Sequence, residues 1–185
     1  MTRLRYFAIT ATFALLAGCS DYSADRLTAP SADIVIQANG TTHVVKTPRQ
    51  YGDWALSLIQ PSGGSLSAGG HTLQVPTGAV SAPTWFLMYV ADSDAVQVTL
   101  KAWRAIDRAP VTQFNNVPVR LTLDASRRGI LDPAGLVVVY LRDGTTSGAL
   151  EAVPSTVDSS KWTVTGVLTH FSAYALAREY APGID

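Results

Sequence analysis

The sequence predicts an all-β protein with the architecture of an antiparallel β-sandwich, and it leaves barrel-like closure open as an alternative. Apolar and polar residues alternate with a period of two in several segments, which is the pattern of half-buried strands. Turn residues separate these segments at short, regular intervals. No segment has the period of a convincing amphipathic helix, and the nearest, residues 173–180, is short. Many short strands with turns between them are typical of sandwiches and barrels.

Strand signals begin after residue 33. Residues 34–45 read as a hairpin, in which Asn39-Gly40 suits a type I′ turn because both central residues need positive φ. Trp85–Val90 is a continuous apolar run, which predicts a strand covered on both faces. Residues 96–102 and 117–123 alternate apolar with polar side chains. We therefore expect each of these two strands to have one buried and one solvated face.

The second half continues in the same way. Residues 136–141 are rich in β-branched side chains, and Asp143-Gly144 follows as a turn signal. Residues 162–168 form a further predicted strand. Gly166 lies on its apolar face, where the missing side chain indicates a bulge. Residues 171–175 close the series.

The first nineteen residues have the layout of a bacterial lipoprotein signal. Two arginines precede an apolar stretch at residues 6–16, and Leu16, Ala17 and Gly18 then lead to Cys19. The stretch is too short to cross ~30 Å of hydrocarbon, which takes about 20 residues in a helix. We predict cleavage before Cys19 and lipid attachment to its thiol, several acyl chains making the anchor lasting. An ordinary secretory signal with a chance cysteine is the alternative.

This signal has consequences for the cellular location of the protein and for the stability of its domain. Cys19 is the only cysteine, so the exported domain has no disulfide and depends on its core. Ser20 follows where many lipoproteins that look like this carry an aspartate that retains them on the inner membrane. We therefore expect a lipid-anchored protein of the bacterial cell envelope, with the outer membrane favoured over the inner.

Charge argues against nucleic acid as a partner. The chain has 14 Lys and Arg and 14 Asp and Glu. Removal of residues 1–18 deletes two arginines, and 12 basic minus 14 acidic residues leaves a net charge of −2. No basic patch or arginine run remains to neutralise phosphates.

Motifs at both ends of the main strand region resemble a known family. Gly63-Gly64-Ser65-Leu66 and residues 73–80 (LQVPTGAV) resemble the opening of a ZU-five domain, named from zonula occludens proteins and uncoordinated-five netrin receptors. Residues 153–158, the strand at 162–168 and His170-Phe171-Ser172-Ala173-Tyr174 resemble its close. The resemblance implies a sandwich that acts as a non-enzymatic protein-interaction module, as ZU-five domains do in ankyrins.

The resemblance completes the predicted organisation of the chain. The expected parts are a signal peptide at 1–18, a flexible tether at 19–32, N-terminal strands leading into the domain at 33–62, a ZU-five-like β-sandwich at 63–176 and a C-terminal tail at 177–185.

His170, Phe171 and Ser172 are the one place where covalent chemistry is conceivable. Some proteins that carry this domain class cleave their own backbone at a His-Phe-Ser site. The Ser172 hydroxyl would attack the Phe171 carbonyl with His170 as base, and the resulting ester would be hydrolysed. Such an attack needs a strained peptide and an oxyanion donor, which a sequence does not reveal. The favoured interpretation is that Phe171 is a core residue and that the protein is not an enzyme.

Metal ligands are sparse, and we predict neither a metal nor a cofactor. His43, His71 and His170 lack the spacing of a zinc site. Asp92-Ser93-Asp94 offers only two carboxylates, whereas Ca²⁺ takes six to eight oxygens.

Aromatic residues leave two binding functions open. Trp85 and Trp162 lie in predicted strands and are expected in the core, whereas Trp103 stands near a loop between basic residues and is the candidate ligand-contact aromatic. The first hypothesis is a lipid-anchored module that binds an envelope protein. The second is a module that binds a carbohydrate or envelope polymer through Trp103.

Overall fold

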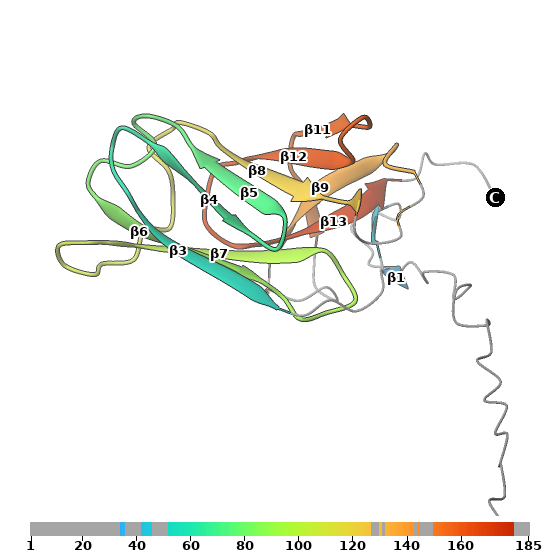
Figure 1. Ribbon diagram of the computed structural model, residues 1–185, viewed down its shortest axis with the longest axis horizontal. Helices are drawn as coiled ribbons and strands as arrows, with labels where there is room; N and C mark the ends of the chain where they lie inside the picture. The colour runs from blue at the N-terminus through green and yellow to red at the C-terminus, as the bar shows by residue number, and fades with distance from the viewer. Residues whose placement is uncertain are drawn as a thin grey trace, which may run out of the picture. The chain divides into compact units, whose positions relative to one another are not determined.

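Two antiparallel sheets packed face to face form the domain (Figure 1). The computed structural model describes residues 34–35, 42–45, 52–126, 130, 132–142, 144 and 150–179. No α-helix occurs in this part of the chain. The predicted all-β sandwich is therefore confirmed, and the two sheets stay separate instead of closing into one barrel.

The larger sheet has eight strands. Its main path, in spatial order, is β1 (Ile34–Val35), β2 (Thr42–Val44), β13 (Ala173–Glu179), β7 (Gln97–Arg104), β6 (Thr84–Val90) and β3 (Asp53–Ile59). Off this path, β9 (Leu136–Leu141) pairs with β13, and β10 (Leu150–Ala152) pairs with β9.

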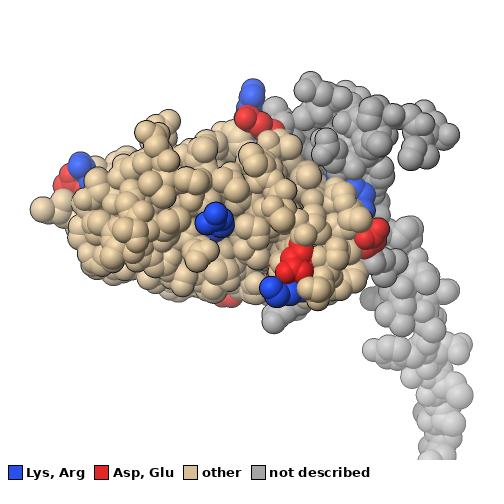
Figure 2. Space-filling model, turned by 90° about the horizontal axis from the view of Figure 1, so that it is seen from above, with Lys and Arg blue, Asp and Glu red and all other residues tan. Residues whose placement is uncertain are grey.

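The smaller sheet has five strands. In spatial order they are β11 (Ser155–Asp158), β12 (Thr163–Leu168), β8 (Val119–Asp124), β5 (His71–Val75) and β4 (Gly64–Ala68). Figure 2 shows few and scattered charged side chains on the side where this sheet lies in Figure 1.

Strand β13 joins the parts of the larger sheet. Along one side it pairs with β9 over six residues. Along the other side, residues 173–175 pair with β7 and residues 177–179 pair with β2. The hairpin predicted at residues 34–45 is present as the β1–β2 pair, with Ile34 opposite Val44. Its Asn39-Gly40 turn lies outside the described residues, as does Asp143.

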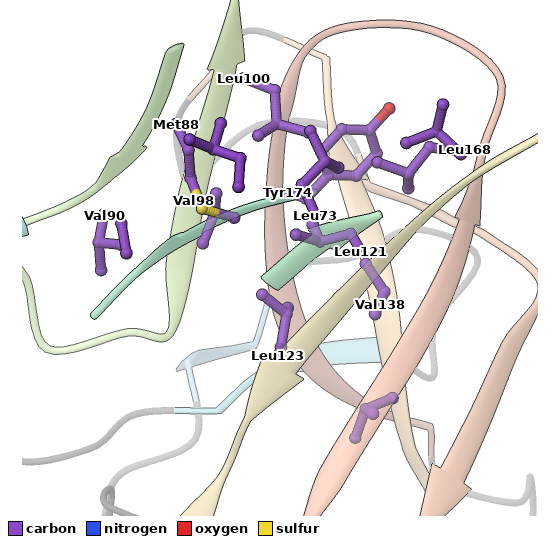
Figure 3. Packing of buried hydrophobic residues seen from close by; sticks show 14 of the residues in the cluster. Leu73, Met88, Val90, Val98, Leu100, Leu121, Leu123, Val138, Leu168 and Tyr174 are labelled. Carbon is purple, nitrogen blue, oxygen red and sulfur yellow. The ribbon is translucent and has the colours of Figure 1, made fainter. Parts of the chain in front are cut away.

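The core fills the space between the sheets because every second side chain of each strand points inward. On β7, Val98, Leu100 and Ala102 are buried, as the alternation predicts. Figure 3 shows residues of β6 and β7 facing Leu73 and Leu121 of the smaller sheet. Burying one such leucine or valine contributes roughly 1.5–3 kcal/mol.

The opening motif of the resemblance forms a corner between the sheets. Gly63 and Gly78 have φ of 90° and 82°, a region that favours glycine. The Gly63 N–H donates to the Gln60 carbonyl at 2.9 Å, and the Gly78 N–H donates to the Pro61 carbonyl at 2.8 Å. The motif therefore ties the β3–β4 turn to the loop after β5, which is a structural role.

The strand over Trp85–Val90 is present as part of β6, but the expectation that both its faces are covered is wrong. Phe86 and Met88 face the core, whereas Trp85 and Leu87 are only half-buried and Tyr89 is exposed. Among the described residues, no second layer covers this part of the outer face of the sheet. A continuous apolar run here therefore marks one buried face and one apolar exposed face.

The bulge predicted at Gly166 is also wrong. Gly166 lies in regular pairing, opposite Ser155 of β11 and Leu121 of β8. A Cβ atom at this position would come 2.8 Å from the Val138 Cβ on β9. The glycine is therefore required because the two sheets approach closely here.

We predict that Gly166→Ala lowers the free energy of unfolding by about 1–3 kcal/mol, because the added methyl group overpacks the core. The control is Gly64→Ala, whose Cβ would lie 3.5 Å from the Ile59 side chain, an ordinary contact. Urea denaturation of both variants measures the difference. Equal stability of the two variants would contradict the packing argument.

Asp158 organises the turn between β11 and β12. Its Oδ1 accepts hydrogen bonds from the Ser160 hydroxyl at 2.6 Å and the Ser160 N–H at 3.1 Å. The Lys161 ammonium lies 3.2 Å from Oδ2. The hydrogen bond from Ser160, with further contributions from Lys161, lowers the pKa of Asp158 from 3.8 to about 2.

This shift predicts a pH-dependent contribution to stability. Because the pKa of Asp158 is lower in the folded state, its carboxylate stabilises the fold above the ordinary pKa of 3.8, and this contribution disappears as the pH falls toward 2. Asp158→Asn should be less stable than the parent at pH 6, and the difference should shrink between pH 4 and pH 2. Urea denaturation across this pH range measures it; a pH-independent difference would refute it.

Candidate functional site

The predicted lipidation site lies outside the described residues. This holds for Cys19 and for Leu16, Ala17 and Gly18 before it. Among the described residues, no helix combines the length and apolar character needed to cross a bilayer.

His170 belongs to an aromatic cluster at the start of β13. Its ring lies edge-on to Tyr140, with 4.6 Å between ring centroids. The Tyr174 hydroxyl donates to the His170 carbonyl at 2.6 Å, and its oxygen lies 3.2 Å from Nδ1. Burial raises the pKa of the Tyr174 hydroxyl, which therefore keeps its proton and remains a donor.

Phe171 and Ser172 are held by packing and backbone hydrogen bonds. The Phe171 ring lies 4.4 Å from that of Phe114, and its N–H donates to the Thr112 carbonyl at 3.0 Å. The Ser172 carbonyl accepts from the Leu100 N–H at 2.8 Å. In the described structure no hydrogen bond joins the side chains of His170 and Ser172. The geometry places Phe171 against the core, as the favoured interpretation expected.

The histidines are dispersed. His71 is buried on β5, where its Nδ1 accepts a hydrogen bond from the Asp124 N–H at 3.0 Å. His170 lies in the aromatic cluster, and the His43 side chain lies outside the description. No group of three or more His, Cys, Asp or Glu within the described ranges is arranged to hold a metal ion.

The candidate site is instead a sheet surface, the outer face of β3, β6 and β7. The registers align its side chains in three rows across the strands. We call this surface the apolar face, and its rows are Trp54–Tyr89–Thr99, Leu56–Leu87–Lys101 and Leu58–Trp85–Trp103.

Exposure concentrates on this surface. Trp54 is 64% exposed, Tyr89 and Leu56 are each 44% exposed, and Leu58 is 40% exposed. These are four of the five large hydrophobic residues found exposed in the described chain, the fifth being Ile106 in the loop after β7. Such clustering is unusual, because exposed apolar residues are normally scattered singly.

The rest of the same outer surface is covered. On β13, Ala173, Ala175 and Ala177 are buried in a small cluster with Val139 and Leu141 of β9. The outer surface of one sheet therefore has a covered part, in which β13 contributes only alanines, and an open part that carries large aromatic and aliphatic side chains.

The apolar face contains a hollow of about 270 Å³. It is lined by Trp54, Leu87, Tyr89, Thr99 and Lys101. Lys101 is the one charged residue in the three rows, and it forms no ion pair with a carboxylate of the described residues. The hollow thus combines a largely apolar lining with a single positive charge.

Sequence reasoning located this surface only in part. Trp103, the candidate ligand-contact aromatic, lies in it but is half-buried. The expectation that Trp85 is in the core is wrong, since it points to the outer face beside Trp103. Trp162 is half-buried and packs against the core just before β12, with a φ of 54°. The most exposed tryptophan of the described residues is Trp54, whereas the sequence favours Trp103 as the contact residue.

Comparison with family models, curated proteins and solved structures finds no match for this chain. The functional interpretation therefore stands on the residues and their geometry.

We predict that the chain remains intact at Phe171–Ser172, because Phe171 is packed and the His170 ring contacts tyrosines. Intact-mass spectrometry of the purified protein should show one species, unchanged in Ser172→Ala. Loss of the 14 residues that follow Phe171, abolished by Ser172→Ala, would instead establish self-cleavage.

Proposed function

We propose that this protein is a non-catalytic, lipid-anchored module of the bacterial cell envelope that binds a protein partner through its apolar face. The observation that carries the proposal is the gathering of exposed Trp54, Leu56, Leu58 and Tyr89 on one surface. Exposed apolar surface of this kind typically marks an interaction site.

The composition of the apolar face supports a protein partner. The centres of protein interfaces are poor in charge and rich in tryptophan and tyrosine, with a polar rim around them. Here Lys101 is the only charge in the three rows, and tryptophan and tyrosine make up four of their nine residues. Tryptophan and tyrosine are also the residues that most often dominate binding energy.

The apolar face is smaller than a complete protein interface, so it would form only the centre of the contact with the partner. Three strands at about 4.8 Å spacing and five residues at about 3.4 Å give roughly 14 by 17 Å. A standard interface buries about 800 Å² on each partner. The partner therefore contacts the rim as well, and the apolar face supplies the central contacts.

The predicted anchor is compatible with this arrangement. Fourteen residues lie between Cys19 and Ile34, the first residue of β1, and can span up to about 50 Å when extended. Strand β1 lies at one edge of the larger sheet, whereas β3 is at the opposite edge. The residue after Cys19 favours the outer membrane as the site of anchoring.

The resemblance to ZU-five domains supports the same class of function by analogy of fold alone. Protein binding in that family does not identify a surface, and the apolar face is proposed from the exposure of its side chains.

Carbohydrate binding is the second candidate. The strongly exposed Trp54 beside Tyr89 favours it, because sugars stack on accessible aromatic rings. The leucines of the surface and the half-buried Trp103 favour a protein. Titration with soluble glycans, read by tryptophan fluorescence, separates them. A saturable change that Trp54→Phe abolishes would favour a glycan.

We predict that a photoreactive phenylalanine analogue in place of Leu56 forms discrete protein adducts in the native envelope. The control position is Ser67, which is exposed on β4 of the other sheet. Adding Leu58→Asp to the Leu56 probe should reduce the adducts about tenfold or more, because a charge at the centre of the interface is left desolvated. Denaturing gels and mass spectrometry measure the adducts.

The same cross-linking experiment distinguishes a protein partner from a membrane lipid on the apolar face. Adducts to lipid alone would place the apolar face on the membrane surface and overturn the proposal. Equal labelling from positions 56 and 67 would show that no specific partner occupies the surface, with the same consequence.

A further inference from the structure

We infer that the hollow in the apolar face receives one large apolar side chain of the protein partner, with a carboxylate next to it. This inference rests on the proposed function and specifies the chemistry of the partner. It is carried by the shape of the hollow and by the single positive charge at its wall.

The register of three strands places the walls of the hollow. Trp54 on β3 lies directly opposite Tyr89 on β6, and Tyr89 lies opposite Thr99 on β7. In the next row, Leu87 lies opposite Lys101. Two aromatic side chains and a leucine thus enclose the apolar part, and the hydroxyl and the ammonium group stand together on β7.

The hollow has room for one large side chain. It measures about 270 Å³, close to the lower end of the ~300–1,000 Å³ of typical ligand pockets. A phenyl, indole or isobutyl group has the size to enter it. The flat remainder of the apolar face, with Leu56 and Leu58, would contact the surface around such an anchor.

The positive charge of Lys101 favours a partner group of negative charge next to that side chain. The cross-strand neighbour of Lys101 on β6 is the uncharged Leu87, and no carboxylate of the described residues forms an ion pair with Lys101. By contrast, Arg104 contacts Asp107, and Lys161 contacts Asp158. An anion of the partner can therefore pair with Lys101, and apolar neighbours on one side reduce the screening of that pair by water.

The test uses 3-phenylpropionate and the uncharged 3-phenylpropionamide as probes of the full chain in detergent. The two differ only in the carboxylate, so their affinity ratio isolates the charge. Fluorescence of Trp54 and its neighbours reports binding, which we expect in the millimolar range for fragments of this size. The carboxylate should bind about two- to fivefold more tightly than the amide.

Matched variants test which residues cause the binding of the probes and the preference for the carboxylate. Lys101→Met keeps the stem but removes the charge, and it should bring the ratio of the two affinities to about one while the amide still binds. Trp54→Ala, read by the remaining tryptophans, should weaken both probes about fivefold or more. Lys161→Met removes a cation from the β11–β12 turn and should change neither affinity.

Equal binding of the two probes to the parent, or no saturable binding of either, would overturn the inference. So would a charge preference that persists in Lys101→Met. These outcomes are separate from the cross-linking result. Protein adducts at position 56 with no probe binding would refute the hollow alone, whereas probe binding with only lipid adducts would refute the protein partner.

Discussion

Burial of the inner faces of two sheets against each other holds this domain together, since the sequence has a single cysteine and no disulfide within the chain can assist. Each buried leucine or phenylalanine contributes a few kcal/mol, and the conformational entropy lost on folding offsets most of the sum. The sheets must therefore pack closely. Where β12 meets β9, the approach leaves no room for a methyl group, and Gly166 is the residue that satisfies it.

Packing of the inner faces leaves the outer faces free to differ. The smaller sheet presents hydroxyl side chains to solvent, and Thr122 and Thr165 bond each other across β8 and β12 at 2.9 Å. On the outer face of the larger sheet, the alanines of β13 are buried, whereas Trp54 and Tyr89 are exposed to water. Exposing large aromatic side chains does not stabilise the fold, and this is the physical basis of the binding role that we propose.

Period-two alternation is sufficient to predict the all-β class and several of the strands, including β7, β8 and β12. It was insufficient for the apolar face, because alternation reveals that two faces exist and not which one meets the core. On β3, Trp54, Leu56 and Leu58 are the larger residues and hydrophobicity alone would bury them, yet they point outward while Ala55 and Ser57 point inward. The continuous apolar run of β6 was misinterpreted for the same reason.

The sequence by itself determined the class of fold and the β1–β2 hairpin, and it indicated that Phe171 packs against the core. These depend on local rules of backbone angle and alternation. Only the tertiary structure decided that Gly166 marks a close approach of sheets and that Trp54, Tyr89 and Lys101 share one hollow. Both depend on which strands become neighbours, and the layer that covers a strand comes from residues distant in the chain.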